Sequence, residues 1–429
     1  MLLRFPFKNF RSFRDEAVLD LRATKITERA DTVVNLGHEK VLPVAAIYGA
    51  NASGKSNVID AFAYMQYYVT SSLEFGGQAE VKNKDKEYAN PEPFLFDSVA
   101  KRGASEFEVY FTMPQDPKEK IYQYGFIVNA QGVVEEWLNS KAKTSRGDFK
   151  VIFYRNTAAA ELDLSGISKI KQENIRVSLE KETLVVSLGA QLKIEKLKAV
   201  RDWFADNEIL DFGRPELNFF LSNFIPEGFD SDAAVRQNVV KYLASFDTSI
   251  VDFRVETVEN VDKNGGKNYK IDTVHRMVNG DSTATIPLRK ESAGTLKMFA
   301  IYPHLRKVLN NGGILVVDEL NSRLHPLLVR TLVLEFLNPE LNKKHAQLIF
   351  TTFDSWSLNN ETLRRDEIWF TDKDAQGLST LYSLADIRGE TSAKIRKDEN
   401  YEKKYLLGKY GAIPAVKNFM IAESSNGAK

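Results

Sequence analysis

The eight-residue stretch GANASGKS, residues 49–56, constrains the fold of this chain more than any other part of its sequence. It fits the pattern G-x-x-x-x-G-K-[S/T] at every position. The preceding segment VLPVAAIY (41–48) is a continuous apolar run with the length of a buried strand, and the following segment VIDAFAYMQYYV (58–69) repeats its apolar residues at helical spacing. A chance glycine-rich turn has no reason to carry these flanks. The stretch therefore predicts a phosphate-binding loop between a strand and a helix.

The residue types in this loop suit a nucleoside triphosphate. Gly49 and Gly54 let the backbone curl until several N–H groups face one phosphate, which also lies at a helix N-terminus. Lys55 directs a positive charge at the outer phosphates, and the Ser56 hydroxyl is placed to ligand Mg²⁺. We therefore expect ATP and Mg²⁺ as ligands and Lys55 as a catalytic group. The expected nucleotide-binding residues of the loop are Gly49, Ala50, Asn51, Ala52, Ser53, Gly54, Lys55, Ser56 and Asn57.

A strand that ends in acids is the second half-site that such a loop requires. The segment ILVVDE (314–319) has four apolar residues followed by two carboxylates. Asp318 at the end of the strand is expected to hold Mg²⁺. Glu319, one residue later, is expected to point to the opposite face because side chains alternate along a strand. That orientation leaves Glu319 free to act as the general base on an attacking water.

Composition argues against several other classes of protein. The 58 basic and 58 acidic residues give a formal net charge of zero. The overall charge therefore does not indicate binding to nucleic acid or to a membrane. A neutral chain can still carry a local basic face. There is no cysteine, and the five histidines have no ligand-like spacing, so a dedicated metal site is not expected. No apolar run approaches the ~18 residues that span a bilayer, and no signal-peptide pattern is present. We expect a cytoplasmic protein.

Strand and helix patterns alternate along the chain, which predicts an α/β fold with a mixed sheet, an antiparallel β lobe and a helical insertion. Residues 1–155 are expected to form an N-terminal lobe that carries the phosphate loop, and 246–385 a C-terminal lobe that carries the acidic pair. Between them, 156–245 is predicted to be a helical insertion, with helices near 184–206 and 233–245. A hairpin turn is expected at 263–266. Residues 386–429 form a charged tail for which we expect a role in partner binding.

Six short segments resemble a known superfamily when they are taken in chain order: KNFRSF (8–13), YGANASGKSN (48–57), ESAGT (291–295), VVDELNSRLHP (316–326), IFTTFD (349–354) and YLLGKYGAIP (405–414). They resemble the ABC/SMC-type ATPases and, more narrowly, the prokaryotic AAA-labelled ATPases of the RloA and AbiLi kind. Those proteins are often encoded in anti-phage defence or abortive-infection loci. The resemblance covers both ends of the chain well and the middle poorly. It implies the fold of an ABC/SMC-like ATPase head.

The resemblance also implies ATPase sites that two heads share. Ser292, Ala293, Gly294 and Thr295 would be the signature motif, which binds the γ-phosphate held by the partner's phosphate loop. Small residues permit close backbone approach, and the dipole of the helix that follows favours an anion. Asn321 lies in the D-loop, where relatives more usually have an aspartate. Arg11 lies where related proteins contact the nucleotide.

The sequence departs from the superfamily pattern at the switch region. Phe353 stands where many relatives carry a histidine that senses the γ-phosphate, and a phenyl ring donates no hydrogen bond. Either hydrolysis is slow, or the sensing falls to Thr352, Asp354 or a residue of a partner. The Q-loop glutamine of the superfamily has no clear counterpart, and Gln123 is the candidate.

These features predict an ATP-hydrolysing switch that forms a homodimer or a higher homo-oligomer around ATP. The expected partner is an effector from a neighbouring gene, a Toprim or RloB-like nuclease or a toxin. No nuclease activity is expected in this chain, because Asp372-Lys373-Asp374 fits a hairpin turn better than a Toprim motif, and His325 before Pro326 fits a helix start. Two alternatives stay open: a RecF-like DNA-repair ATPase that clamps DNA, and a nucleotide-locked scaffold with very slow turnover.

Overall fold

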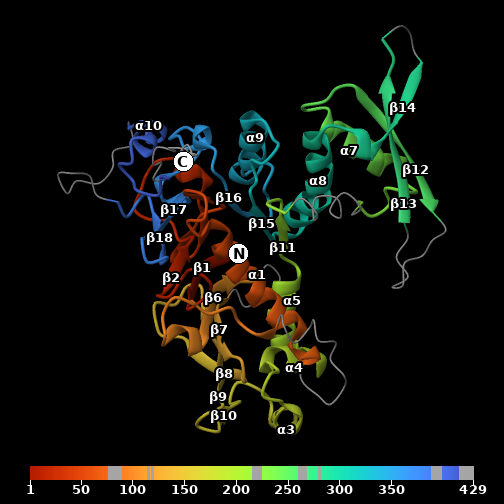
Figure 1. Ribbon diagram of the computed structural model, residues 1–429. Coiled ribbons are helices and arrows are strands. Elements are labelled where there is room, and N and C mark those ends of the chain that lie inside the picture. The colour runs from red at the N-terminus through yellow and green to blue at the C-terminus, as the bar shows by residue number, and fades with distance from the viewer. Residues whose placement is uncertain are drawn as a thin grey trace, which may run out of the picture.

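A six-stranded mixed sheet forms the centre of the protein (Figure 1). The computed structural model describes residues 1–75, 89–113, 116, 120–214, 225–258, 268–278, 282–387 and 399–414. The strand order of the central sheet is β11-β15-β16-β5-β17-β18, and its pairs are parallel except for β17 with β18. The strands are β5 (Val44–Tyr48), β11 (Glu208–Asp211), β15 (Ile314–Asp318), β16 (Gln347–Thr351), β17 (Ile368–Lys373) and β18 (Ser379–Ser383).

Alternate residues of the central strands face two separate cores. In β5, Ala45 and Ile47 belong to one core, and Val44, Ala46 and Tyr48 belong to the other. Because both faces of β5 are covered, this strand is apolar at every position, as expected in a buried parallel sheet. Helix α1 (Lys55–Ser71) packs in the first core, and α8 (Ala293–Asn311) and α9 (Pro326–Leu337) pack in the second.

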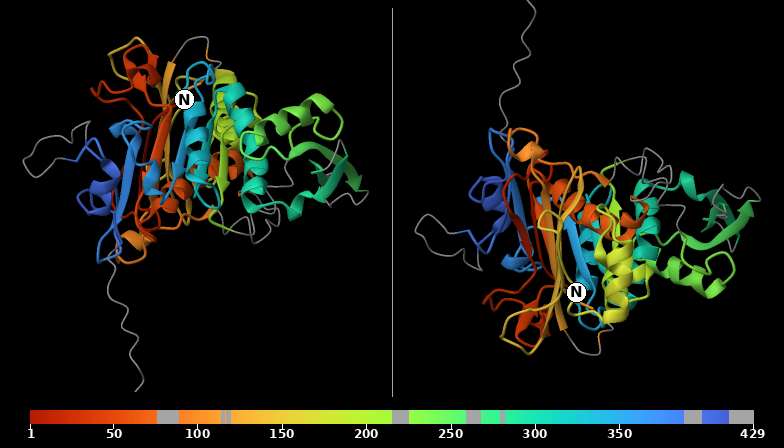
Figure 2. Two further views of the ribbon diagram at one scale, coloured as in Figure 1. Left: turned by 90° about the horizontal axis from the view of Figure 1, so that it is seen from above. Right: turned by 90° about the horizontal axis from the view of Figure 1, so that it is seen from below.

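A seven-stranded antiparallel sheet lies on the α1 side of the central sheet (Figure 2). Its order is β10-β9-β8-β7-β6-β1-β2. The fully buried Gln347 joins the two sheets, because its side chain accepts from the Leu2 N–H at 2.6 Å and donates to the Leu2 and Leu42 carbonyls. The strands are β1 (Leu2–Lys8), β2 (Ala17–Asp20), β6 (Ser105–Thr112), β7 (Lys120–Asn129), β8 (Gly132–Ala142), β9 (Lys150–Asn156) and β10 (Glu161–Asp163); β3 (Val34–Leu36) pairs separately with β4 (Glu39–Val41).

The region predicted as a helical insertion contributes directly to both sheets. Besides α3 (Lys169–Ser178), α4 (Val185–Gln191), α5 (Glu195–Ala205) and α7 (Ala233–Leu243), it contains β10 and β11. The helix expected over 184–206 is broken at Lys193, whose φ of 55° is left-handed. Glu136 of β8 accepts from the first two N–H groups of α4, so a residue distant in sequence caps this helix.

A smaller three-stranded antiparallel sheet stands out from the body together with α7 (Figure 1, green). Its strands are β12 (Ile250–Val258), β13 (Asn268–Arg276) and β14 (Thr283–Pro287). The sheet packs on α8 through aromatic contacts, among them Phe253 with Phe299, whose ring centroids lie 5.6 Å apart. The hairpin turn predicted at 263–266 lies outside the described residues.

Part of the predicted tail belongs to the body of the protein. Helix α10 (Tyr401–Leu406) and the residues up to 414 pack against the β17–β18 edge of the central sheet. The Tyr405 ring stacks on Phe370 at 5.5 Å, and the Tyr382 hydroxyl donates to the Tyr410 carbonyl. Residues 388–398 and 415–429 of the tail lie outside the described part of the chain.

The predicted fold class is confirmed: the protein is α/β, with a mixed central sheet, an antiparallel lobe and a largely helical segment between the two halves. The domain limits stay predictions. Within the described ranges, no helix has both the length and the apolar character needed to cross a membrane.

Candidate nucleotide-binding site

The phosphate loop and the acidic pair meet at one edge of the central sheet. They follow β5 and β15, which run parallel to each other with β16 between them. Parallel strands place their carboxyl ends at the same edge, and ligand sites of α/β sheets occur there. The topology therefore unites two segments that lie about 270 residues apart in the sequence.

The loop between β5 and α1 requires its two glycines. A Cβ on Gly49 would lie 2.5 Å from both the Ser53 hydroxyl and the Thr371 carbonyl oxygen. Gly54 has a φ of 111°, and a Cβ there would lie 2.6 Å from the Ser379 hydroxyl. Gly54 is the N-cap residue of α1 and has no side chain, so no N-cap side chain accepts from the first N–H groups of the helix. The result is a tightly curled loop at a helix N-terminus.

The Lys55 ammonium lies inside the curl of the loop. It donates to the Gly49 and Ala50 carbonyls, both at 2.9 Å, and the side chain is buried. Burial lowers the pKa of Lys55, whereas the nearby carboxylates of Asp318 and Glu319 raise it. Lys55 therefore lies within electrostatic reach of both acids, as the sequence motifs predict.

Neighbouring strands hold the loop from outside. The Ser53 hydroxyl bonds to that of Thr371 at 2.6 Å, and Ser379 donates to the Ser53 carbonyl at 2.7 Å. Asn57 uses its side-chain amide to donate to the Ser12 hydroxyl. Asn57 thus anchors the loop to the KNFRSF segment. The remaining predicted residues, Asn51, Ala52 and Ser56, are exposed at the rim, with Ser56 in the first turn of α1.

Thr351 at the end of β16 fixes the acidic pair. Its hydroxyl donates to the Asp318 carboxylate and accepts from the Glu319 N–H, the latter at 2.8 Å. Strand β15 ends at Asp318, and Glu319 has a left-handed φ of 52°. The alternation of a strand therefore does not set the direction of Glu319, and Thr351 positions its backbone instead. Sequence reasoning named Thr352 and missed Thr351.

Two further acids that the sequence analysis missed lie near Asp318. Asp211, at the end of β11, is in register with Asp318, and burial and the Asp318 charge both raise its pKa. Asp60 lies one turn after Ser56 on α1, and burial raises its pKa to about 6 although Arg11 opposes the shift. Only the pairing of β11 with β15 brings Asp211 here. Asp60 could have been found from its i+4 spacing to Ser56.

Arg11, a predicted nucleotide contact, is committed to acids of its own chain. Its guanidinium pairs with Asp60 and donates to the Glu92 carboxylate at 3.0 and 3.1 Å. Burial alone would lower the pKa of Arg11, but the two carboxylates outweigh it and raise the pKa. The arginine thus lies beside the helix that carries Ser56 and braces that helix.

The signature segment caps α8 and exposes its N-terminus. The Ser292 hydroxyl accepts from the Thr295 N–H at 3.1 Å and bonds the Thr295 hydroxyl at 2.8 Å. Ser292 and Ala293 are exposed. A Cβ on Gly294 would lie 3.2 Å from the Arg323 carbonyl oxygen, so a small residue lets α8 approach the D-loop closely. In the described part of the chain, no hydrogen bond joins residues 292–295 to the phosphate loop.

Residues 44–352, well over half of the chain, match the family described as "AAA domain, putative AbiEii toxin, Type IV TA system". The chain belongs to this AAA family. The match confirms the predicted membership among the AAA-labelled P-loop ATPases, and the matched range contains the phosphate loop, the signature segment and the acidic pair.

Solved structures of low identity are also similar to this AAA protein. An SMC head bound to the C-winged helix domain of ScpA is 14% identical, with a TM-score of 0.42 over 89% of this chain and 97% of that one. The SMC head domain from Thermotoga maritima is 15% identical, with a TM-score of 0.40 over 89% and 98%. No curated protein sequence matches the chain.

The switch region of this AAA protein uses two of its three predicted residues internally. Thr352 is fully buried, and its hydroxyl accepts from the Asp354 N–H. Asp354 caps the 3-10 helix η5 (Ser355–Ser357) by accepting from the Trp356 N–H. Phe353 is 55% exposed. The segment therefore presents an aromatic ring at the position predicted for a γ-phosphate sensor.

The remaining candidates take structural roles. Gln123, the Q-loop candidate, lies in the antiparallel sheet, where its side chain donates to Glu108 and Tyr110. Asp374 accepts from the Gln376 and Leu378 N–H groups in the β17–β18 turn, which confirms the predicted hairpin. His325 caps α9 with Pro326 at its first position, as predicted.

The residues present fit MgATP. The glycine cradle cannot admit a side chain, the α1 N-terminus is open, and a lysine lies within the curl. Among the described residues, no group of three or more histidine or acidic side chains could hold a metal ion alone. The Ser56 hydroxyl and the Asp318 carboxylate are the groups that would hold Mg²⁺, an ion that prefers oxygen ligands. The D-loop residue Asn321 is 8% exposed, and its Oδ1 has no hydrogen-bond partner in the described structure.

Proposed function

We propose that this AAA-family protein hydrolyses ATP between two copies of itself and thereby switches an effector protein. The observation that carries the proposal is the division of the site. Lys55, Asp318 and Glu319 converge at one edge of the central sheet, whereas Ser292 opens the exposed end of α8 without contacting them. An ATPase site of this superfamily needs both parts, and a second copy can supply the missing one.

The chain's own residues account for the steps of hydrolysis. The N–H groups of residues 50–56 would hold the β-phosphate, and the Lys55 ammonium would exchange its two carbonyl partners for phosphate oxygens. Glu319 would accept the proton of the attacking water, and Thr351 would keep its backbone in place. Ser56 and Asp318 would hold Mg²⁺, which would neutralise negative charge on the phosphates. The partner's Ser292 and α8 N-terminus would stabilise the γ-phosphate.

Hydrolysis at different protein concentrations tests the shared site. ATPase activity per subunit should rise with concentration and then reach a plateau, because the dimer forms by mass action. Ser292→Arg should abolish the activity without changing ATP binding by the single head. Glu319→Gln should bind ATP and accumulate as a dimer whose mass can be measured in solution. Activity that is independent of concentration and intact in Ser292→Arg would rule the shared site out.

The effector part of the proposal draws on the family description, which names a "putative AbiEii toxin" and a "Type IV TA system". The Asp372–Asp374 segment, which resembles a nuclease motif in sequence, forms the turn between β17 and β18. We therefore assign the toxic or nucleolytic chemistry to a partner encoded nearby. The ATP-bound Glu319→Gln protein should co-purify with the product of the adjacent gene. Metal-dependent nuclease activity of the purified chain that survives Asp372→Ala would contradict this assignment.

A nucleotide-locked scaffold is the second candidate, and the exposed Phe353 favours it. A phenyl ring cannot report the γ-phosphate, while Thr352 and Asp354 already have partners. The scaffold would bind ATP and dimerise but turn over only rarely. Rapid steady-state hydrolysis that Glu319→Gln abolishes excludes it.

A further inference from the structure

A buried lysine links α8 to the catalytic loop of the same chain. Lys297 lies five residues after Ser292, and only 5% of it is exposed. Its ammonium donates to the carbonyls of Glu319 and Leu320, each at 2.8 Å, and it meets both the carbonyl and the hydroxyl of Ser322 at 3.0 Å. One side chain thus engages three residues of the loop that begins with the proposed general base.

The same ammonium also reaches Phe212, the residue that follows β11. It lies 4.2 Å from the centroid of the Phe212 ring, a cation–π contact. The Phe212 N–H in turn donates to the Asp318 carbonyl at 3.2 Å. Lys297 is therefore a point where α8, the loop after β15 and the end of β11 come together. The loop and the end of β11 carry Glu319 and Asp211 of this chain's own site, and α8 begins after Ser292, which would serve the partner's site.

Burying a charge here is costly, which makes a purely space-filling role a poor explanation. Burial lowers the pKa of Lys297 to about 7; the Glu319 and Asp318 charges oppose this shift, and Arg323 adds to it. An apolar side chain of similar length would fill the same space without that desolvation. An ammonium, unlike an apolar chain, fixes several carbonyl oxygens of one loop in a set arrangement.

The loop that Lys297 holds is also the loop that α8 touches at its start. The Arg323 carbonyl lies against Gly294, and Glu319 has a left-handed backbone. A displacement of the first turns of α8 therefore acts on residues 319–323 through two contacts, one at Gly294 and one at Lys297. Of the two contacts, only the one at Lys297 depends on direction, because it consists of several hydrogen bonds, whereas the contact at Gly294 is a close van der Waals approach.

We infer that Lys297 is a positioning residue that couples the two ATP sites of the dimer. When Ser292 binds the nucleotide held by the partner, α8 moves. The hydrogen bonds of Lys297 then shift the loop that contains Glu319 and Asn321 of its own site. The inference rests on the proposed shared-site function. It predicts that each site hydrolyses ATP in response to occupancy of the other.

The test compares the wild-type chain with Lys297→Met and Lys297→Arg, using ATP as the probe. Lys297→Met should leave ATP affinity of the single head within about twofold, lower turnover in the dimer by about 5- to 150-fold, and reduce the Hill coefficient from near 2 to about 1. Lys297→Arg keeps a charge that can donate to the same carbonyls, so it should restore most of the coupling. Lys343→Met makes the same change at an exposed position before β16 and should behave as wild type.

The outcomes separate this inference from the proposed function. If Lys297→Met dimerises with ATP and keeps both turnover and Hill coefficient, the inference is wrong and the shared site stands. If the wild type itself shows no concentration dependence and a Hill coefficient of about 1, the proposed function fails and the inference falls with it. Should Lys297→Met not fold, Ser322→Ala removes one partner of the ammonium and should give a smaller loss of the same sign. An unchanged Ser322→Ala would then reject the coupling.

Discussion

At the scale of single residues, Thr351 controls both members of the acidic pair. Its hydroxyl is shared between the Asp318 carboxylate and the Glu319 N–H, and the side chain is fully buried. The carboxylate and the backbone of the proposed base are therefore held by one group. Nothing in the sequence distinguishes this threonine from Thr352, because both end the same apolar run.

Thr351→Val should damage catalysis more than binding. Valine keeps the shape and removes the hydrogen bonds, so the base loses its support while the phosphate loop is untouched. We expect kcat for ATP to fall by about 100-fold, with KM within about threefold of wild type. Thr352→Val is the matched control, since the Thr352 hydroxyl accepts from the Asp354 N–H and, among the described residues, bonds neither acid. Equal losses in the two variants would show that Thr351 has no special role.

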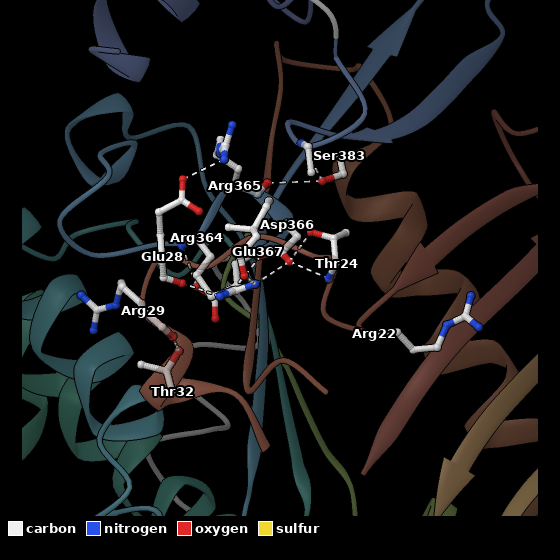
Figure 3. A network of polar contacts seen from close by, with 12 residues as sticks. Arg22, Thr24, Glu28, Arg29, Thr32, Arg364, Arg365, Asp366, Glu367 and Ser383 are labelled. Atoms are coloured by element: carbon white, nitrogen blue, oxygen red, sulfur yellow. Dashed lines mark hydrogen bonds and ion pairs between the residues drawn. The ribbon is translucent and has the colours of Figure 1, made fainter. Parts of the chain in front are cut away.

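At the scale of elements, a buried polar network ties the loop after β2 to the start of β17 (Figure 3). Arg364 donates to the Asp366 carboxylate and to the carbonyls of Glu28 and Ile26, and Thr24 donates to Asp366 through both its N–H and its hydroxyl. Next to them, Glu367 lies fully buried in the 3-10 helix η6 (Arg365–Glu367). The network fixes the strand that lies beside β5.

Glu367 should make stability depend on pH. Burial raises its pKa from an ordinary value of 4.5 to about 8, so the folded protein binds an extra proton between these values. The contribution of Glu367 to the free energy of unfolding is therefore greatest below about pH 4.5, and it is lost as the pH rises through about 8. Glu367→Gln should remove that loss and stabilise the protein above pH 8 by roughly 2–4 kcal/mol in urea unfolding. Glu361→Gln, at an exposed position, should have no such effect.

Helix α10 is a second element whose attachment can be tested. Tyr405 is 6% exposed, stacks on Phe370 and donates its hydroxyl to the Ala412 carbonyl. Tyr405→Ala should weaken the docking of residues 399–414 by about 3–5 kcal/mol and expose them to limited proteolysis. Leu406→Ala changes the neighbouring residue, which is 62% exposed, and should leave the cleavage pattern as in wild type. Identical cleavage of both variants would contradict the docking.

At the scale of the whole molecule, the site depends on both halves of the chain. The phosphate loop comes from the N-terminal half and the acidic pair from the C-terminal half, and β16 lies between their strands. A nucleotide bound there contacts segments that chain connectivity alone leaves far apart. Nucleotide binding should therefore stabilise the folded chain as a unit.

This stabilisation can be measured against a variant that cannot hold the phosphates. With MgATP at about 100 times its Kd, the wild-type chain should gain about 2.7 kcal/mol of unfolding free energy. Lys55→Ala should gain far less, because the ammonium at the centre of the loop is missing. The measurement is chemical denaturation with and without MgATP, with MgCl₂ alone as the reference. A gain that is equal in both proteins would place the nucleotide elsewhere.

Much of this architecture follows from local sequence. Apolar runs of strand length predicted β5 and β15, and helical spacing predicted α1, each within a few residues of its observed ends. The loop 49–56 and the pair Asp318-Glu319 were recognisable because each is a contiguous pattern with its own flanking element. Strand β11 escaped notice because it has four residues and adjoins a helical segment.

What the sequence determined by itself is the set of pieces: a glycine cradle with a lysine, a strand ending in two acids, and a serine that caps a helix. Those features depend on residues within a few positions of one another, where backbone geometry dictates the outcome. Only the tertiary structure decided that Thr351 holds the acids, that Asp211 joins them, and that Lys297 ties α8 to the catalytic loop. These contacts join segments between 22 and 107 residues apart, and a contact across that separation is set by strand pairing and by packing of the whole core.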